Sequence, residues 1–216
     1  MKTSKSNDFY DTLKAGIFKI IGKNVISKML TFEIANLAYT FFLWKKKDSD
    51  IKQFSYYKSN GIRILLLVAV FMILMETAIV HLLLARKGYD MIAWILSIIS
   101  LYSAIQIYSH IKAMKLRPFA LHNNKLFIRY GLFGDVIVNT DELDQVELTK
   151  KDPVDTNDKR TESLAMVKDI EGHNIALHFT KKQRIEKPFG LSKDCDILLI
   201  NLDNSEEFVE TLNQIK

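Results

Sequence analysis

Two long apolar segments, Ile64 to Ala85 and Met91 to Ile111, lie almost end to end and constrain this chain more than any other feature. At about 1.5 Å rise per residue they would be roughly 33 and 31 Å long as helices, which matches a hydrocarbon core of about 30 Å. The five residues between them allow only an antiparallel pair, and Gly88 among them suits the end of a helix. The sequence therefore predicts a transmembrane helical hairpin over residues 64–111.

The distribution of lysine and arginine predicts how this hairpin is oriented. Basic residues near membrane segments stay on the cytoplasmic side. They are Lys45, Lys46, Lys47, Lys52, Lys58 and Arg63 before the hairpin, and Lys112, Lys115, Arg117 and Lys125 after it, against Arg86 and Lys87 in the loop. We therefore expect a multi-pass protein of a bacterial inner membrane with cytoplasmic N- and C-termini, which also places the lone Cys195 in a reducing compartment.

The same basic residues, next to the membrane segments, account for the net charge of +5. Juxtamembrane lysines facing anionic lipid explain it, and no zinc finger, helix-turn-helix or RNA-binding pattern accompanies it. The lipid bilayer is the expected partner, and nucleic acid is not.

Residues 1–63 form an ambiguous N-terminal region. Residues 8–28 show a basic amphipathic pattern that favours a helix in the membrane interface. Residues 29–44 are apolar but only about 24 Å long as a helix, too short for an ordinary span. A helix half-buried in the cytoplasmic leaflet or docked on the hairpin is favoured over a true crossing, which stays open. Trp44, Tyr56 and Tyr57 would then lie at headgroup level.

Polar side chains inside the hairpin are the candidate functional residues. Glu76 lies near the middle of the first segment, where a carboxylate costs several kcal/mol unless it is protonated, paired or hydrated. Antiparallel pairing would bring it level with Ser100 to Ser103, and would bring His81 level with Trp94 and Ser97. Four side chains of the second segment form a stripe within an arc of about 120° that we expect to face Glu76: Ser100, Ser103, Gln106 and His110.

Two interpretations of these groups stay open. Glu76 can be a neutral glutamic acid that is hydrogen-bonded to serine and helps the helices pack. Alternatively, Glu76, His81 and His110 could form the site of an intramembrane proton- or ion-coupled or metal-dependent enzyme. Glu76 and His81 lie about 140° apart around one helix, so a metal would need further ligands such as Glu33. We favour the first interpretation, with no metal ligands, cofactor or catalytic residues.

After Arg117 the pattern changes from helical to alternating, which predicts a strand-rich cytoplasmic domain over residues 112–216. The Asn123-Asn124 pair predicts the turn of the first hairpin. Residues 151–161 read as a loop, as does the basic cluster at 181–184. A final helix begins at Ser205 and should bury Phe208 and Leu212. The predicted strands cover residues 119–121, 126–130, 135–139, 143–148, 163–169, 174–179 and 196–202. The expected class is α+β.

Residues 117–216 resemble bacterial pleckstrin-homology-like domains. The likeness is carried by residues 125–132, KLFIRYGL, by residues 136–139 and 143–146, and by the ending 201–208, NLDNSEEF. The resemblance implies an antiparallel β-sandwich or barrel capped by one helix, which binds lipid headgroups, peptides or proteins. Members that bind phosphoinositides carry several basic residues in the first hairpin, whereas residues 122–125 here are His, Asn, Asn and Lys. Headgroup binding at that hairpin is therefore not expected.

The front half is similar to a group of bacterial membrane proteins without an assigned function, through residues 30–34, 44–47, 54–58, 75–77 and 81–83. Together these observations favour a non-catalytic, membrane-anchored interaction module. Its domain would bind a protein partner or the membrane surface, and a membrane protein or a second copy of the chain is the expected partner.

Overall fold

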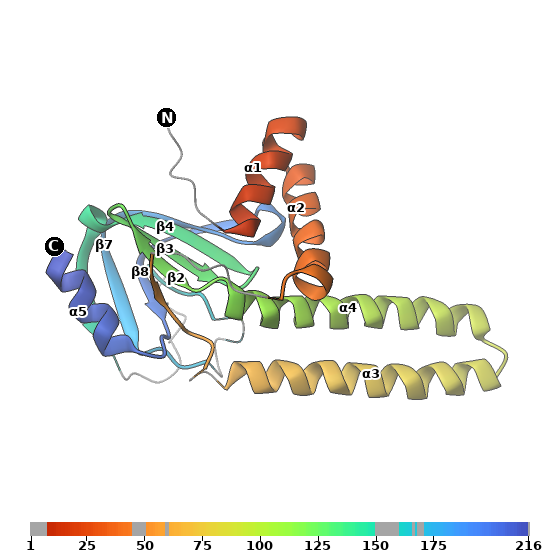
Figure 1. Ribbon diagram of the computed structural model, residues 1–216. Coiled ribbons are helices and arrows are strands. Elements are labelled where there is room, and N and C mark those ends of the chain that lie inside the picture. The colour runs from red at the N-terminus through yellow and green to blue at the C-terminus, as the bar shows by residue number, and fades with distance from the viewer. Residues whose placement is uncertain are drawn as a thin grey trace.

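The computed structural model describes residues 8–44, 51–58, 61–149, 160–165, 167 and 171–215 (Figure 1). It is an α+β structure in which N-terminal helices, including a hairpin of two long apolar helices, precede an open mixed sheet with a C-terminal helix. Most of the loop predicted at 151–161 lies outside the described residues.

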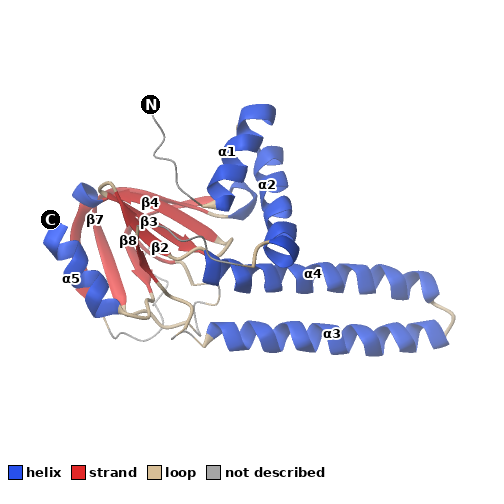
Figure 2. Cartoon of the chain, in the orientation of Figure 1, coloured by secondary structure: helices blue, strands red, loops and turns tan. Residues whose placement is uncertain are grey.

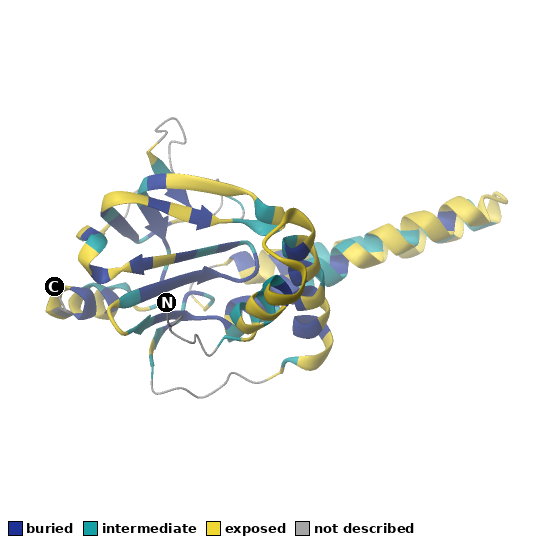
Figure 3. Ribbon diagram, turned by 90° about the horizontal axis from the view of Figure 1, so that it is seen from above, coloured by how far each residue is buried: buried dark blue, intermediate teal, exposed yellow. Residues whose placement is uncertain are grey.

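The predicted helical hairpin is present. It consists of α3 (Ile62–Arg86) and α4 (Asp90–Leu116), joined by a turn in which Gly88 takes a φ of +81°. Both helices are long and apolar enough to cross a membrane, yet only 6% of the most apolar stretch of α3 and 11% of that of α4 are buried. Core helices of a soluble protein would bury most of this surface. Figure 3 shows the hairpin projecting from the rest of the chain with exposed residues along its length.

Two shorter helices precede the hairpin. They are α1 (Phe9–Ile21) and α2 (Val25–Leu37), the latter extended by a π-helical turn, η1 (Ala38–Phe42). The helix expected over residues 8–28 is interrupted, because Gly22 ends α1 at a φ of +86° and Asn24 caps α2 through a 2.7 Å hydrogen bond from the Ser27 N–H. Figure 1 shows α1 and α2 side by side, standing across the axis of α4. α2 and η1 both contact α4, which agrees with docking on the hairpin, one of the two positions expected for residues 29–44.

Within the described residues, eight strands form one sheet, shown in red in Figure 2, in the order β1-β2-β3-β4-β7-β8-β6, with β5 also paired to β7. The sheet is mixed because β6 runs parallel to β8, while the other pairs are antiparallel. The strands are β1 (Lys52–Phe54), β2 (Phe119–His122), β3 (Lys125–Tyr130), β4 (Gly134–Asn139), β5 (Leu143–Leu148), β6 (Thr161–Ser163), β7 (Ile175–Glu186) and β8 (Ser192–Ile200).

The first strand comes from the chain before the hairpin. Residues 52–54, which the sequence groups with the N-terminal region, pair with β2 at the edge of the sheet. Tyr56 follows and is only 1% exposed, so the expectation that it lies at headgroup level is wrong. Its hydroxyl instead accepts a 2.7 Å hydrogen bond from the Gly131 N–H. Both strands that flank the α3–α4 hairpin in sequence therefore belong to one sheet.

The long strand β7 departs most from the sequence prediction. Its first five residues, 175–179, pair with β5, and its last residue, Glu186, pairs with β4. A break in register against β8 falls between His178 and Gln183. The basic cluster at 181–184, expected in a loop, is therefore part of a strand, and Gln183 is buried. The strand expected over 163–169 is limited to Thr161–Ser163, and residues 166 and 168–170 lie outside the described part.

The main core lies between the sheet and its covering helices. Leu126, Ile128 and Leu198 are fully buried, and the C-terminal helix α5 (Ser205–Ile215) closes the core. As predicted, α5 buries Phe208 and Leu212. The Phe208 ring meets the Phe54 ring edge-on, at 4.9 Å between centroids.

Candidate functional site at the joint between helices and sheet

Only two residues separate α4 from β2, and the first of them, Arg117, is the centre of the candidate site. Its side chain has no exposed surface. Its Nε donates to Asp8 Oδ2 at 2.7 Å, its Nη2 donates to Asp135 Oδ2 at 3.0 Å, and its Nη1 donates to the Gly131 carbonyl. One guanidinium thus joins α1, the end of α4, the β3–β4 turn and β4.

A second arginine completes this network. Arg129 on β3 lies 2.9 Å from Asp11 and 3.4 Å from Asp8, measured from guanidinium nitrogen to carboxylate oxygen. We refer to Asp8, Asp11, Arg117, Arg129 and Asp135 as the joint cluster. Two aromatic side chains support it: the Tyr39 hydroxyl donates to Asp8 at 3.4 Å, and the Tyr10 ring lies 4.5 Å from the Arg117 guanidinium. Three carboxylates and two guanidinium groups therefore lie together where the helices meet the sheet, and each carboxylate is paired with at least one guanidinium.

Burial and charge act against each other on these groups. Burial raises the pKa of Asp135, although Arg117 beside it works in the opposite direction. Burial works to lower the pKa of Arg117, but Asp135, Asp8 and the other surrounding anions raise it well above its ordinary value. Arg117 is therefore always charged, and leaving it unpaired in this environment would be costly.

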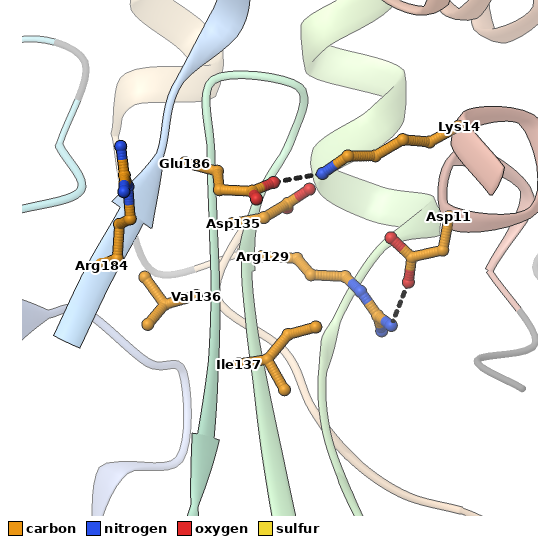
Figure 4. A pocket seen from close by; sticks show the side chains of 8 residues that line it. All are labelled: Asp11, Lys14, Arg129, Asp135, Val136, Ile137, Arg184 and Glu186. Atoms are coloured by element: carbon orange, nitrogen blue, oxygen red, sulfur yellow. Dashed lines mark hydrogen bonds and ion pairs between the residues drawn. The ribbon is translucent and has the colours of Figure 1, made fainter. Parts of the chain in front are cut away.

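A pocket of about 240 Å³ opens beside the cluster (Figure 4). Asp11 and Arg129 line it from α1 and β3, while Lys14 and Glu186 form an ion pair across it. Apart from Arg184, which donates to Ser192 Oγ, its charged side chains are paired carboxylates and cations, an arrangement that fixes elements in place. Within the residues that the structure describes, no group of three or more His, Cys, Asp or Glu side chains could hold a metal ion.

The hairpin brings together some of the predicted polar residues. His81 Nδ1 lies 2.8 Å from Ser97 Oγ, and the His81 ring lies 5.0 Å from the Trp94 ring, which confirms the predicted level. Ser100, Ser103 and Gln106 are half-buried along α4. The Ser103 hydroxyl donates to the Ile99 carbonyl of its own helix.

Glu76 does not meet the serine stripe. It is exposed, and among the described residues it has neither a hydrogen bond nor an ion pair, so the predicted contact with Ser100 or Ser103 is absent. The reason is rotational. His81 faces α4, and Thr77, four positions earlier, lies on the same side of α3. Glu76 is about 100° away from Thr77 around the helix.

His110 is also not on a stripe facing Glu76. It is fully buried under the β3–β4 turn, where its ring lies 4.6 Å from the Phe133 ring and its Nδ1 accepts from the Leu132 N–H at 3.3 Å. Because His81 pairs with Ser97, Glu76 is level with about residue 102 of α4. His110 lies eight residues further along α4, which is roughly 12 Å. Glu76, His81 and His110 are therefore not brought together in one chain.

Polar contacts that α2 and the following turn η1 make with α4 take the place of the predicted stripe contact. The pairs are Tyr102 Oη to Glu33 at 2.6 Å, Ser109 Oγ to Asn36, and Lys112 Nζ to the Thr40 carbonyl at 3.0 Å. The signal was present in the sequence, since residues 33, 36 and 40 fall on one side of a helix.

The joint cluster was missed, because its members are scattered over residues 8–135 and only the fold brings them together. Comparison with known proteins offers no further guide: no protein-family model, curated protein sequence or solved structure matches the chain.

Proposed function

We propose that this chain is a non-catalytic, membrane-anchored interaction protein that presents its sheet domain at a fixed position on the inner face of a bacterial membrane. The observation that carries this proposal is the joint cluster. Arg117 is fully buried and binds both α1 and β4 two residues before the first strand that follows the hairpin. A domain held this way cannot swing freely on a linker, so its distance from and orientation to the bilayer are set.

The exposed surface of the hairpin supports a membrane crossing. From Ile64 to Leu83 the α3 surface is dominated by exposed apolar side chains over about 30 Å of helix, the thickness of a hydrocarbon core. The excess of lysine and arginine on the domain side supports cytoplasmic termini.

The second helix supports an interfacial position for the N-terminal region. Ile26, Leu30, Ile34 and Leu37 on α2 are all exposed and lie within an arc of about 80°. Other sides of α2 contact α4 and the tip of the β7–β8 hairpin, η3 (Pro188–Gly190). An apolar stripe beside two membrane helices is suited to burial among lipid chains.

The sheet supports a pleckstrin-homology-like interaction domain. An antiparallel run β2-β3-β4, a long β7 with a break in its register against β8, and a closing C-terminal helix agree with the expected outline. The parallel β6–β8 pair and the strand contributed from before the hairpin are departures from it. We propose that this domain binds a protein partner at the membrane, either another membrane protein or a second copy of the chain.

Photocrosslinking in intact membranes tests this function. A photoreactive residue at Leu148, which is 52% exposed on β5, should give a discrete protein adduct. Arg117→Met should weaken that adduct even when the protein remains in the membrane, because the domain is no longer held in place. Glu76→Gln is the matched control and should leave it intact.

Two results would contradict the proposal. One is the absence of any protein adduct from Leu148. The other is an ion- or proton-coupled activity that disappears in Glu76→Gln, which would favour the intramembrane alternative.

A further inference from the structure

A large groove lies between the α1–α2 pair and the tip of the β7–β8 hairpin. Its volume is about 1020 Å³, at the upper end of the range for small-molecule sites. The smaller pocket of Figure 4 adjoins it, and the two share Asp11, Lys14, Asp135 and Glu186 among their lining residues. The Asn123-Asn124 turn of the first hairpin of the sheet does not line the groove.

The walls of the groove carry an excess of positive charge. Each of its three acidic side chains is already paired: Asp11 with Arg129, Asp135 with Arg117, and Glu186 with Lys14. Four lysines along its walls have no acidic partner among the described residues. They are Lys19, Lys23, Lys28 and Lys187. A ligand that complements this groove therefore carries negative charge.

The groove also has apolar walls. Phe18 on α1 and Phe127 on β3 line it, together with Phe189 and Leu191 at the tip of the β7–β8 hairpin. Phe189 is 41% exposed and Leu191 66% exposed. A free phosphate would leave this apolar surface in water, whereas an amphiphile would cover it.

The tip is held in position against α2. Phe189 has a φ of +59°, a strained conformation for an aromatic residue, and its ring packs on Phe32 of α2 at 4.9 Å between centroids. The Lys28 side chain crosses Gly190, where an added Cβ would come within 2.8 Å of Lys28 Cδ. The groove is thus a fixed part of the fold, and Lys28 forms part of its wall.

The position of the groove points to the source of the ligand. α2 forms one wall with Lys28 and Thr31, and on another side it carries the exposed apolar stripe from Ile26 to Leu37. α2 also contacts α4 through Asn36 and Ser109. This contact lies close to the end of the exposed apolar surface of α3 that is nearer to the sheet. A molecule in the adjacent leaflet could therefore enter without leaving the bilayer.

We propose that this groove binds one anionic phospholipid from the adjacent leaflet, with its phosphate against Lys23, Lys28 and Lys187 and an acyl chain along Phe18 and Leu191. Bound there, the lipid would bridge the N-terminal helices and the sheet. The inference rests on the proposed membrane crossing, because the lipid is taken from the bilayer.

Thermal unfolding of the purified full-length protein in a neutral detergent tests the inference. Phosphatidylglycerol at saturation should raise the midpoint by roughly 5–10 °C, whereas phosphatidylcholine with the same acyl chains should not. The double variant Lys28→Gln/Lys187→Gln should bind phosphatidylglycerol roughly 25-fold more weakly, about fivefold for each lysine. The control Lys181→Gln/Lys182→Gln removes two exposed lysines outside the groove and should bind as the wild type does.

Further comparisons separate the possible ligands and causes. Glycerol phosphate, the soluble headgroup, should give no shift, and Phe18→Ala should weaken the lipid effect while the lipid-free midpoint stays close to that of the wild type. Equal shifts with both lipids, equal losses in both lysine pairs, or a full shift with glycerol phosphate or an acidic peptide would overturn the proposal. Insertion into vesicles is measured separately: a protein that inserts but shows no lipid preference contradicts this inference alone.

Discussion

Arg117 is buried among the carboxylates of the joint cluster, and Arg117→Met should destabilise the folded state strongly. The substitution removes the main counter-charge of Asp8 and Asp135 and a more distant partner, at 3.8 Å, of Asp11; the side-chain exposures are 9% for Asp8, 19% for Asp135 and 26% for Asp11. Removing one partner of a buried pair costs about 3–5 kcal/mol. Because two of the carboxylates are partly hydrated, we expect about 3 kcal/mol, which lowers the unfolding midpoint by roughly 6–12 °C.

The assay can use the native cysteine. Cys195 is 1% exposed on β8, so a thiol reagent should reach it only when the domain unfolds. Labelling is followed against temperature in detergent for the wild type, for Arg117→Met and for the control Arg184→Met. Arg184 is exposed, and its loss should change stability by less than about 0.5 kcal/mol.

A double-mutant cycle identifies the cause of the loss. If uncompensated carboxylates are responsible, adding Asp8→Asn to Arg117→Met should restore part of the lost stability, with a coupling energy above about 1 kcal/mol. The reasoning is refuted if Arg117→Met shifts the midpoint no more than Arg184→Met does, or if the two changes are additive.

Three further predictions concern the domain. Gly131→Ala should lower the free energy of unfolding by at least about 2 kcal/mol in chemical denaturation, because Gly131 has a φ of +52° and the new methyl group would lie 2.4 Å from the His110 ring. The control Gly172→Ala meets no atom within 4 Å and should be near neutral. Phe208→Ala should cost about 3–5 kcal/mol, measured in the same way, because the ring is fully buried; a cost below 1 kcal/mol would contradict the described core. Burial raises the pKa of Cys195 to about 12, so stability should fall as pH rises above about 8.5, where the unfolded thiol ionises and the folded one does not; unfolding midpoints measured from pH 7 to 10 check this.

Local and periodic features of the fold were predictable. The lengths of the two apolar segments predicted α3 and α4, and the alternation of apolar and polar residues predicted the strands from β2 to β5. The apolar stripe with Phe208 and Leu212 predicted α5. These succeed because each depends on neighbours in sequence. The break at Gly22 and the extension of β7 through a basic cluster were missed, since the first needs backbone geometry and the second needs the pairing partner β8.

The candidate site was much less predictable. Glu76 and His110 drew attention because polar residues in apolar segments are unusual, but helix rotation turns Glu76 away from the serines and the sheet covers His110. Arg117 looked like one more juxtamembrane cation. Its role depends on Asp8 and Asp135, which lie far from it in sequence and meet it only after the helices dock on the sheet.

Cysteine accessibility in intact cells tests the central claim most directly, namely that the α3–α4 hairpin crosses the membrane and holds the sheet inside. In a Cys195→Ser background, single cysteines are placed at Tyr89 in the α3–α4 turn and at Leu148 on β5, and both sites are exposed. A membrane-impermeant maleimide should label Tyr89→Cys in intact cells and Leu148→Cys only after permeabilisation. Labelling of Leu148→Cys in intact cells, or protection of Tyr89→Cys until the membrane is opened, would contradict the account.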